Sequence, residues 1–137
     1  MAGYSGTPLP KKLGIQEGHR VALVHAPAGF EKTLGDLPPA VALQAGLTGS
    51  MPFDVILVFV TRRADLERQL AALRRRMDPA AGLWVAWPKK ASRVPTDMTE
   101  DVVREIALPT GLVDNKVCAI DETWSGLRLV IRLEHRR

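Results

Sequence analysis

The segment from Leu83 to Leu133 constrains the fold of this chain more than any other part of it. It opens with the apolar run Leu83–Trp87, which predicts a strand, and a basic loop follows. Asp97 and Glu100 then stand at the spacing of a capping box, which predicts a helix that ends before Pro109. The segment therefore contains a strand, a loop and a helix in succession.

The end of this segment is typical of an antiparallel hairpin. Two strand-like runs, residues 116–121 and 127–132, flank a five-residue link that contains Gly126. A hairpin in this position would add an antiparallel edge to a sheet.

The first half of the chain predicts parallel strands. The predicted strand 20–25 contains the continuous apolar run 21–24, and the run 55–60 is apolar throughout, as in strands that are buried on both faces. We expect a short helix over 30–37, a short strand over 41–43, and a longer helix after Thr61, its candidate N-cap. Apolar residues recur along one face of that longer helix, namely Leu66, Leu70, Leu73 and Met77.

This order of elements predicts an α/β fold. We expect a Rossmann-like, mostly parallel sheet with helices on both faces and a C-terminal antiparallel β-hairpin. The length of 137 residues fits a single domain, 1–137, whose residues 1–12 form an irregular N-terminal arm.

Charge and composition limit the kinds of partner that this protein is expected to bind. The net charge is only +4, whereas nucleic-acid modules usually concentrate more charge on one face. Cys118 is the only cysteine, so no intrachain disulfide can form. No apolar run approaches the roughly 20 residues that cross a bilayer, and no leader is visible. We expect a cytoplasmic protein with no membrane partner, and nucleic acid is not favoured.

Two stretches resemble class I S-adenosylmethionine (SAM) methyltransferases. Residues 13–23 are similar to the lead-in to the first strand of that family, and 53–58 to its middle strand. The family has a glycine-rich turn after the first strand, but residues 25–30 here hold one glycine and a proline. It also has an acidic residue at the end of the second strand, and 41–44 hold none. The resemblance implies the methyltransferase topology without its cofactor site, so we expect no cofactor and no SAM binding at physiological levels.

A second resemblance covers nearly the whole chain. It is to the small bacterial domain of unknown function 3052 family, which implies no particular activity. The segments that carry it are residues 4–9, 84–89, 99–104 and 121–127.

A ligand site is expected at the carboxyl ends of the parallel strands, where open α/β sheets bind ligands. Two of the three loops there are basic, which predicts an anion or nucleotide site for a phosphate-bearing small molecule. Trp87 could floor the pocket, and His25 ends the first strand at its mouth. The alternative is that these loops are merely polar. The basic residues are Arg62, Arg63, Lys89, Lys90 and Arg93.

Trp124 lies in the predicted hairpin link, where an exposed indole would indicate contact with a partner or a ligand. The alternative is that it folds back onto the core. His25 has no evident nucleophile as a partner, and Cys118, Ser92 and Ser125 are only loose candidates. We therefore assign no catalytic residue. One cysteine and three scattered histidines also predict no metal site.

The leading functional hypothesis from sequence is a non-enzymatic binding or interaction module on a Rossmann-like scaffold. One alternative is a degenerate methyltransferase-like enzyme that binds a nucleotide-like ligand. Another is a nucleic-acid-associated protein that uses the basic loops.

Overall fold

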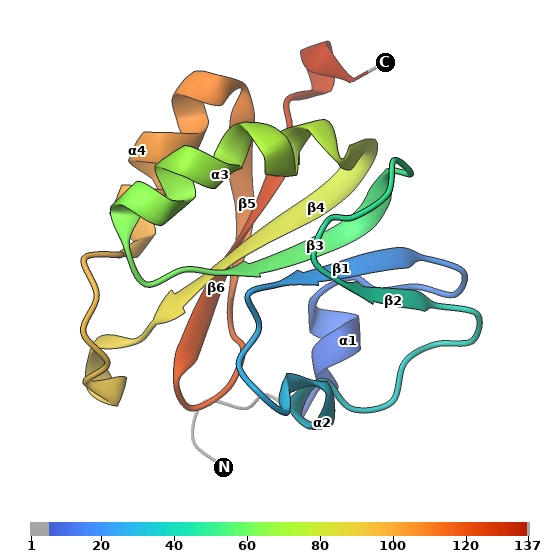
Figure 1. Cartoon of the computed structure of the whole chain (residues 1–137), viewed down its shortest axis with the longest axis horizontal. Coiled ribbons are helices and arrows are strands. Elements are labelled where there is room, and N and C mark those ends of the chain that lie inside the picture. Colours follow the sequence, from blue (N-terminus) through green and yellow to red (C-terminus); the bar gives the residue numbers. More distant parts are fainter. Residues whose placement is uncertain (1–5, 137) are drawn as a thin grey trace.

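The strands form one six-stranded sheet in the computed structural model, which describes residues 6–136 (Figure 1). They are β1 (Arg20–Val24), β2 (Ala42–Ala45), β3 (Phe53–Phe59), β4 (Met77–Pro88), β5 (Leu112–Ala119) and β6 (Trp124–Ile131). Their order in the sheet is β2-β1-β3-β4-β6-β5. The strands β2, β1, β3 and β4 run parallel, whereas β6 pairs antiparallel with both β4 and β5. The mostly parallel sheet with a C-terminal hairpin is thus confirmed.

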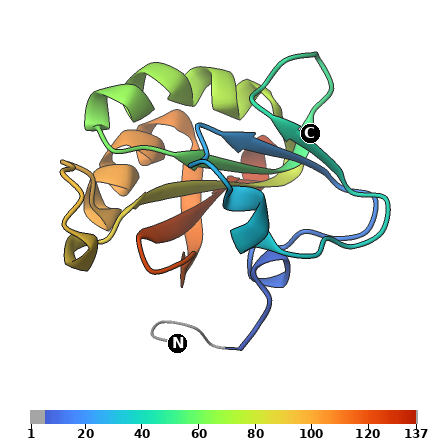
Figure 2. The ribbon, with the colours of Figure 1, turned by 60° about the horizontal axis from the view of Figure 1, so that its bottom comes forward.

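Helices cover both faces of this sheet. They are α1 (Leu9–Lys12), α2 (Phe30–Leu34), α3 (Arg63–Arg75) and α4 (Glu100–Ala107). Figure 2 shows α3 and α4 on one side and the shorter α1 and α2 on the other. Within residues 6–136, no helix has the length and apolar character needed to cross a membrane.

Successive residues of β3 point to opposite faces of the sheet and contribute to a hydrophobic core on each face. Ile56 and Val58 are fully buried on the side of α3, together with the helical residues Leu66 and Leu73. Leu57, one position along, is buried on the side of α1 and α2. The apolar run of this strand is continuous because both of its faces are covered.

Trp84 joins the N-terminal segment to the sheet. Its indole is completely buried on the α1–α2 face, and Nε1 donates a hydrogen bond to the carbonyl oxygen of Leu13 at 3.0 Å. A buried indole N–H requires an acceptor, so this bond sets where the chain after α1 crosses β4.

Several predicted boundaries were wrong. Helix α2 ends at Leu34 and not at residue 37, because Gly35 adopts a left-handed backbone (φ +79°). Strand β4 begins at Met77 and not at Leu83, so Met77 belongs to the strand and not to the face of α3. Of the expected irregular arm, residues 9–12 form α1, and residues 1–5 lie outside the described part of the chain.

The caps of the two longer helices also differ from the prediction. Asp97 does not cap α4: its Oδ1 accepts from the backbone N–H of Arg63 at 2.6 Å, and so it caps α3 across the fold. Thr99 caps α4, since its Oγ1 accepts from the N–H of Val102 at 3.1 Å. Thr61, the predicted cap of α3, instead offers its carbonyl oxygen to the hydroxyl of Thr96.

Loss of the Asp97 carboxylate should therefore weaken α3. We expect Asp97→Ala to lower the free energy of unfolding by about 1 kcal/mol, the usual cost of removing an N-cap acceptor. Thr61→Ala, at the position that sequence spacing indicates, should change it by less than about 0.5 kcal/mol. Urea unfolding of the three proteins measures both values, and a larger loss from Thr61→Ala would contradict the assignment.

Candidate functional site

A cleft of about 440 Å³ opens at the carboxyl ends of β1 and β2. The loop 25–29, which follows β1, forms one wall, and residues 43–46 at the end of β2 form the other. This is the edge where a parallel sheet places its ligands.

His25 stands at the mouth of this cleft in a left-handed backbone conformation (φ +58°). This conformation is uncommon outside glycine, although histidine adopts it more readily than most residues. Its side chain is exposed, directly after the buried end of β1 at Val24. The backbone therefore turns sharply at His25 and leaves the ring at the opening.

A second hollow, of about 290 Å³, adjoins the cleft through His25. Phe59 lines it at the carboxyl end of β3, and Thr61 lies just beyond that end. Its other walls come from α3 and from the start of β6, and they consist of Asp65, Arg68, Gln69 and Trp124. His25 thus borders two neighbouring spaces at the same edge of the sheet.

Trp124 is the first residue of β6 and not the tip of the hairpin. It is half-buried, and its ring meets Phe59 edge to face, with centroids 5.0 Å apart. Most of its contact area is therefore committed to the core, in line with the second of the two interpretations. A protein partner at the remaining exposed part of the ring stays a prediction.

Two polar residues of the cleft were missed by the sequence analysis. Gln44, on β2, is held by hydrogen bonds from Nε2 to the carbonyl oxygens of Gly46 (3.2 Å) and Thr48 (2.7 Å). Glu31, on α2, is exposed and lines the opposite wall. The signal for Gln44 was its place at the end of the second strand, where only an acidic residue had been sought.

Arg63, one of the predicted basic residues, lines neither the cleft nor the adjoining hollow. Its guanidinium bonds Glu105 at 2.7 Å and Glu67 at 3.3 Å, between α3 and α4. The hydrogen bond to Glu105, followed by that to Glu67, raises the pKa of Arg63 above its ordinary value. Its charge is therefore already paired.

The other predicted residues lie outside the cleft and the adjoining hollow. Arg62, Lys90 and Arg93 are exposed, and Lys89 is half-buried, with its backbone N–H bonded to the carbonyl oxygen of Thr123. That these four cations bind phosphate stays a prediction.

Trp87 does not floor the cleft: it is only 7% exposed and packs in the core on the α3–α4 face.

Cys118 lies on β5, the edge strand at the far side of the sheet, so it is remote from β1 and β2 in the strand order. Burial raises the pKa of its thiol, and the positive charges of Lys12 and Lys116 oppose that rise. A raised pKa leaves less thiolate at neutral pH, which does not favour a nucleophilic role.

The pH dependence of alkylation tests this. Because the pKa of Cys118 is raised, the iodoacetamide rate should reach half its maximum at a pH above the ordinary value of roughly 8.5 for a free cysteine. Lys116→Gln should move that midpoint further up, since Lys116 lowers the pKa. Lys11→Gln serves as the matched control. A midpoint below that of the unfolded chain would contradict the burial argument.

Comparison with solved structures decides the fold class. A SAM-dependent methyltransferase from Aquifex aeolicus matches with a TM-score of 0.65 and 19% identity, over 88% of this chain and 87% of that one. A TehB-like SAM-dependent methyltransferase from Corynebacterium glutamicum matches with a TM-score of 0.57 and 11% identity, over 96% and 91%. Aeropyrum pernix fibrillarin, solved with natively bound SAM, has a TM-score of 0.57 and 10% identity, over 93% and 70%.

The chain has a methyltransferase-like Rossmann fold. Neither a scan against models of protein families nor a search of curated proteins finds a match to it.

The leading functional hypothesis from sequence was wrong. The finding against a non-enzymatic module is the shared fold, because the solved structures that have it include the SAM-dependent methyltransferases from Aquifex aeolicus and Corynebacterium glutamicum. A sequence that lacks a familiar catalytic set does not thereby exclude an enzyme, because side chains that are distant in sequence can meet at one site.

Proposed function

We propose that this protein is a methyltransferase-like enzyme, altered at its cofactor loop, whose cleft at β1 and β2 binds a nucleoside-type ligand. The observation that carries the proposal is the position of the cleft, at the carboxyl ends of two neighbouring parallel strands of a methyltransferase-like sheet.

The residues of the cleft do not fit SAM in the way that the fold family implies. Glycines allow backbone to approach that cofactor closely, but residues 25–28 here are His, Ala, Pro and Ala, each with a Cβ atom. Pro27 also lacks a backbone N–H. The end of β2 offers Gln44 in place of a carboxylate. We therefore derive no methyl-transfer step.

The charge of the cleft selects the class of ligand. Among residues 6–136, Glu31 is the only acidic residue that lines the cleft, and no lysine or arginine lines it. Phosphate groups would meet no cation there, so the ligand is a nucleoside without phosphate. The Gln44 amide and the Glu31 carboxylate supply hydrogen-bond acceptors for ribose hydroxyls, and Leu43 and Pro27 supply apolar contact for a base.

Two narrower assignments form part of the proposal. The resemblance of four segments to the domain of unknown function 3052 family supports membership of that family. The lack of a spanning helix among residues 6–136 is compatible with the cytoplasmic location that we propose.

Calorimetric titration with adenosine, ADP and SAM tests the ligand class. We expect adenosine to bind and to raise the melting temperature, since a ligand of the native state stabilises it. ADP should bind more weakly because its phosphates meet no cation, and SAM should show no micromolar affinity. Glu31→Gln should weaken adenosine binding about tenfold, as expected for a charge-assisted hydrogen bond.

Lys32→Gln is the matched control, because Lys32 lies beside Glu31 on α2 but is not among the residues that line the cleft. Tighter binding of ADP than of adenosine would contradict the nucleoside assignment. Micromolar binding of SAM would show that the altered loop still holds the cofactor. If no compound binds, the proposal fails.

His25→Gly separates ligand binding from stability. Glycine adopts the left-handed conformation freely, so the variant should gain up to about 1 kcal/mol in unfolding free energy. Adenosine affinity should nevertheless fall, because the ring at the mouth of the cleft is lost. Unchanged affinity would remove His25 from the site.

A further inference from the structure

A small hollow of about 270 Å³ lies on the α1–α2 face of the sheet, between the segment 12–16 and the strands β5 and β6. Two cations line its sheet side, Lys116 of β5 and Arg128 of β6, and they stand directly opposite each other in the antiparallel pair. Arg128 is also paired with Trp84 of β4, whose indole is buried on the α1–α2 face, so both cations belong to that face. We call this space the basic hollow.

The two cations of the basic hollow are not balanced by negative charge. Like charges directly opposite each other on one face destabilise a sheet. No acidic residue lines the hollow, and no ion pair joins Lys116 or Arg128 to a carboxylate among residues 6–136. Asp114, the only acidic residue of β5, bonds Arg104 of α4 at 3.0 Å on the opposite face. The described residues therefore leave the repulsion between the two cations uncompensated.

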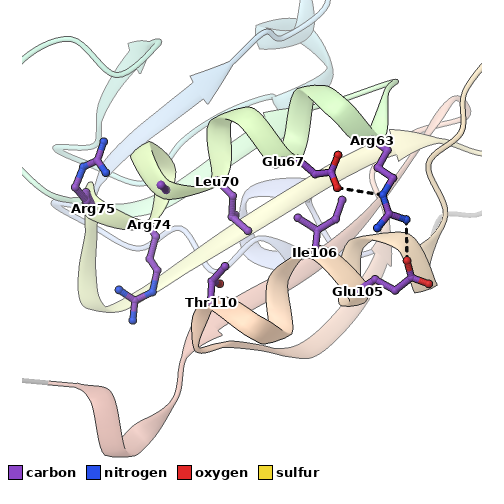
Figure 3. A pocket seen from close by; sticks show the side chains of 9 residues that line it. Arg63, Glu67, Leu70, Arg74, Arg75, Glu105, Ile106 and Thr110 are labelled. Carbon is purple, nitrogen blue, oxygen red and sulfur yellow. Dashed lines mark hydrogen bonds and ion pairs between the residues drawn. The ribbon is translucent and has the colours of Figure 1, made fainter.

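The groove between α3 and α4 shows the opposite arrangement. Its volume is about 570 Å³, and Arg63 is the cation at one end of it. Figure 3 shows the Arg63 guanidinium bonded to the carboxylates of both Glu67 and Glu105. An anion would have to compete with two carboxylates there, whereas it would meet none among the residues 6–136 that line the basic hollow.

The guanidinium of Arg128 lies against the backbone of Gly82 on β4, where a Cβ atom would come to 2.5 Å from Nε. Arg128 is half-buried, and its Nη1 donates a hydrogen bond at 3.4 Å to Oδ1 of Asn115, which lines the hollow. Among residues 6–136 the guanidinium has no other hydrogen-bond partner, so most of its N–H groups remain available. Burial, and then the charge of Arg136, lower the pKa of Arg128, and a nearby anion would stabilise its charged form.

Further donors border the same space. Nζ of Lys116 donates to the carbonyl oxygen of Lys12 at 3.4 Å, which places the ammonium group beside the segment 12–16. Asn115 accepts from Arg128 through Oδ1, so its NH₂ group remains as a donor. Gln16, an exposed residue of the lining, adds a second amide. The hollow thus combines two cations with two amides, a set of donors that suits an anion with several oxygen atoms.

We propose that the basic hollow binds a phosphate group, either free or as the monoester of a small molecule. A phosphate monoester carries close to two negative charges at neutral pH and has three acceptor oxygens, which matches the two opposed cations. The volume of about 270 Å³ is below the range of roughly 300–1,000 Å³ of sites that enclose a drug-sized ligand, so the hollow takes a phosphate with few carbon atoms and not an entire nucleotide. The strands β5 and β6 lie at the other side of the sheet from β1 and β2, so this inference is independent of the nucleoside cleft.

Calorimetric titration with inorganic phosphate and with glycerol phosphate tests the proposal. Both should bind to the parent protein, and glycerol, which lacks the charge, should not bind. Tighter binding of glycerol phosphate would identify an ester as the ligand, and tighter binding of inorganic phosphate would identify the free ion. Arg128→Met, which keeps the aliphatic stem, and Lys116→Gln should each weaken binding of both phosphates about tenfold or more, as expected when a charge-assisted hydrogen bond is lost.

Lys11→Gln is the matched control, because Lys11 is exposed beside Lys12 but does not line the basic hollow. This variant should change the affinity by less than about twofold, since an exposed charge outside the site is screened by salt. A loss in Lys11→Gln equal to that in Lys116→Gln would indicate general attraction to positive charge and would overturn the proposal. Absence of phosphate binding to the parent protein, or equal binding of glycerol, would overturn it as well.

The melting temperature separates a binding role of Lys116 from a structural one. Lys116→Gln removes one of two like charges that stand opposite each other, so without ligand this variant should melt at or above the temperature of the parent protein. Added phosphate should raise the melting temperature of the parent protein more than that of the variant, because it binds the native parent more tightly. A variant that melts below the parent protein and binds phosphate with unchanged affinity would assign Lys116 to the stability of the fold and overturn its role in the site.

Discussion

The fold depends on the need to cover both faces of β3 and β4. Their central residues are buried on each side, so a layer must lie above and below the sheet. On one side, α3 and α4 supply it with long apolar faces. On the other side only α1 and α2 are available, and each is little more than one helical turn. Short helices contribute little stability of their own, so this layer depends on tertiary contacts.

The bond from Trp84 to Leu13 is the clearest of those contacts. It links the strand at the centre of the sheet to the segment that leads into β1. Asp54, on β3, holds the start of β1, since its Oδ2 accepts a hydrogen bond from the backbone N–H of Arg20 at 2.8 Å. The position of β1, and with it the cleft at His25, is therefore set by polar contacts as well as by apolar packing.

The sequence predicted the strands and the helical face of α3 because these depend on patterns of burial. A run buried on both faces is continuously apolar, and a helix buried on one face is periodic. Asp97 was assigned to the wrong helix because capping-box spacing is a local signal, whereas its actual partner is 34 positions away. No local pattern distinguishes the two outcomes.

The candidate site was less predictable for the same reason. Arg63 was one of the basic residues expected at the ligand site, but in the fold its guanidinium bonds Glu105, which is 42 positions away in the sequence. Gln44 and Glu31 come from two elements that meet only at the cleft. Trp124 was placed in a turn because Gly126 follows it, although strand β6 already begins at the indole. Function at such a site rests on contacts between distant segments, which a single sequence does not specify.

The differences from the methyltransferase sequence pattern lie in the loop after β1 and at the end of β2, while the fold of the sheet is shared. A proline and three residues with Cβ atoms now stand where that family places backbone against its cofactor. The sheet can keep its fold through such a change in the loop. In a parallel sheet the direction of the strands places the ligand site at their carboxyl ends, whatever the sequence of the loops there.

The cap of α3 also bears on the order in which this chain folds. The first turn of α3 is held by Asp97 and, through Arg63, by Glu105, both of which are synthesised after β4. A nascent chain that has emerged only as far as α3 can bury the apolar face of this helix against β3. Its first turn still lacks the hydrogen bond that Asp97 later accepts. Completion of that end is thus a late event of high contact order. In the native protein, opening of the segment between β4 and α4 would expose the amides of the first turn of α3 to exchange with solvent, so that two regions distant in sequence fray as one unit.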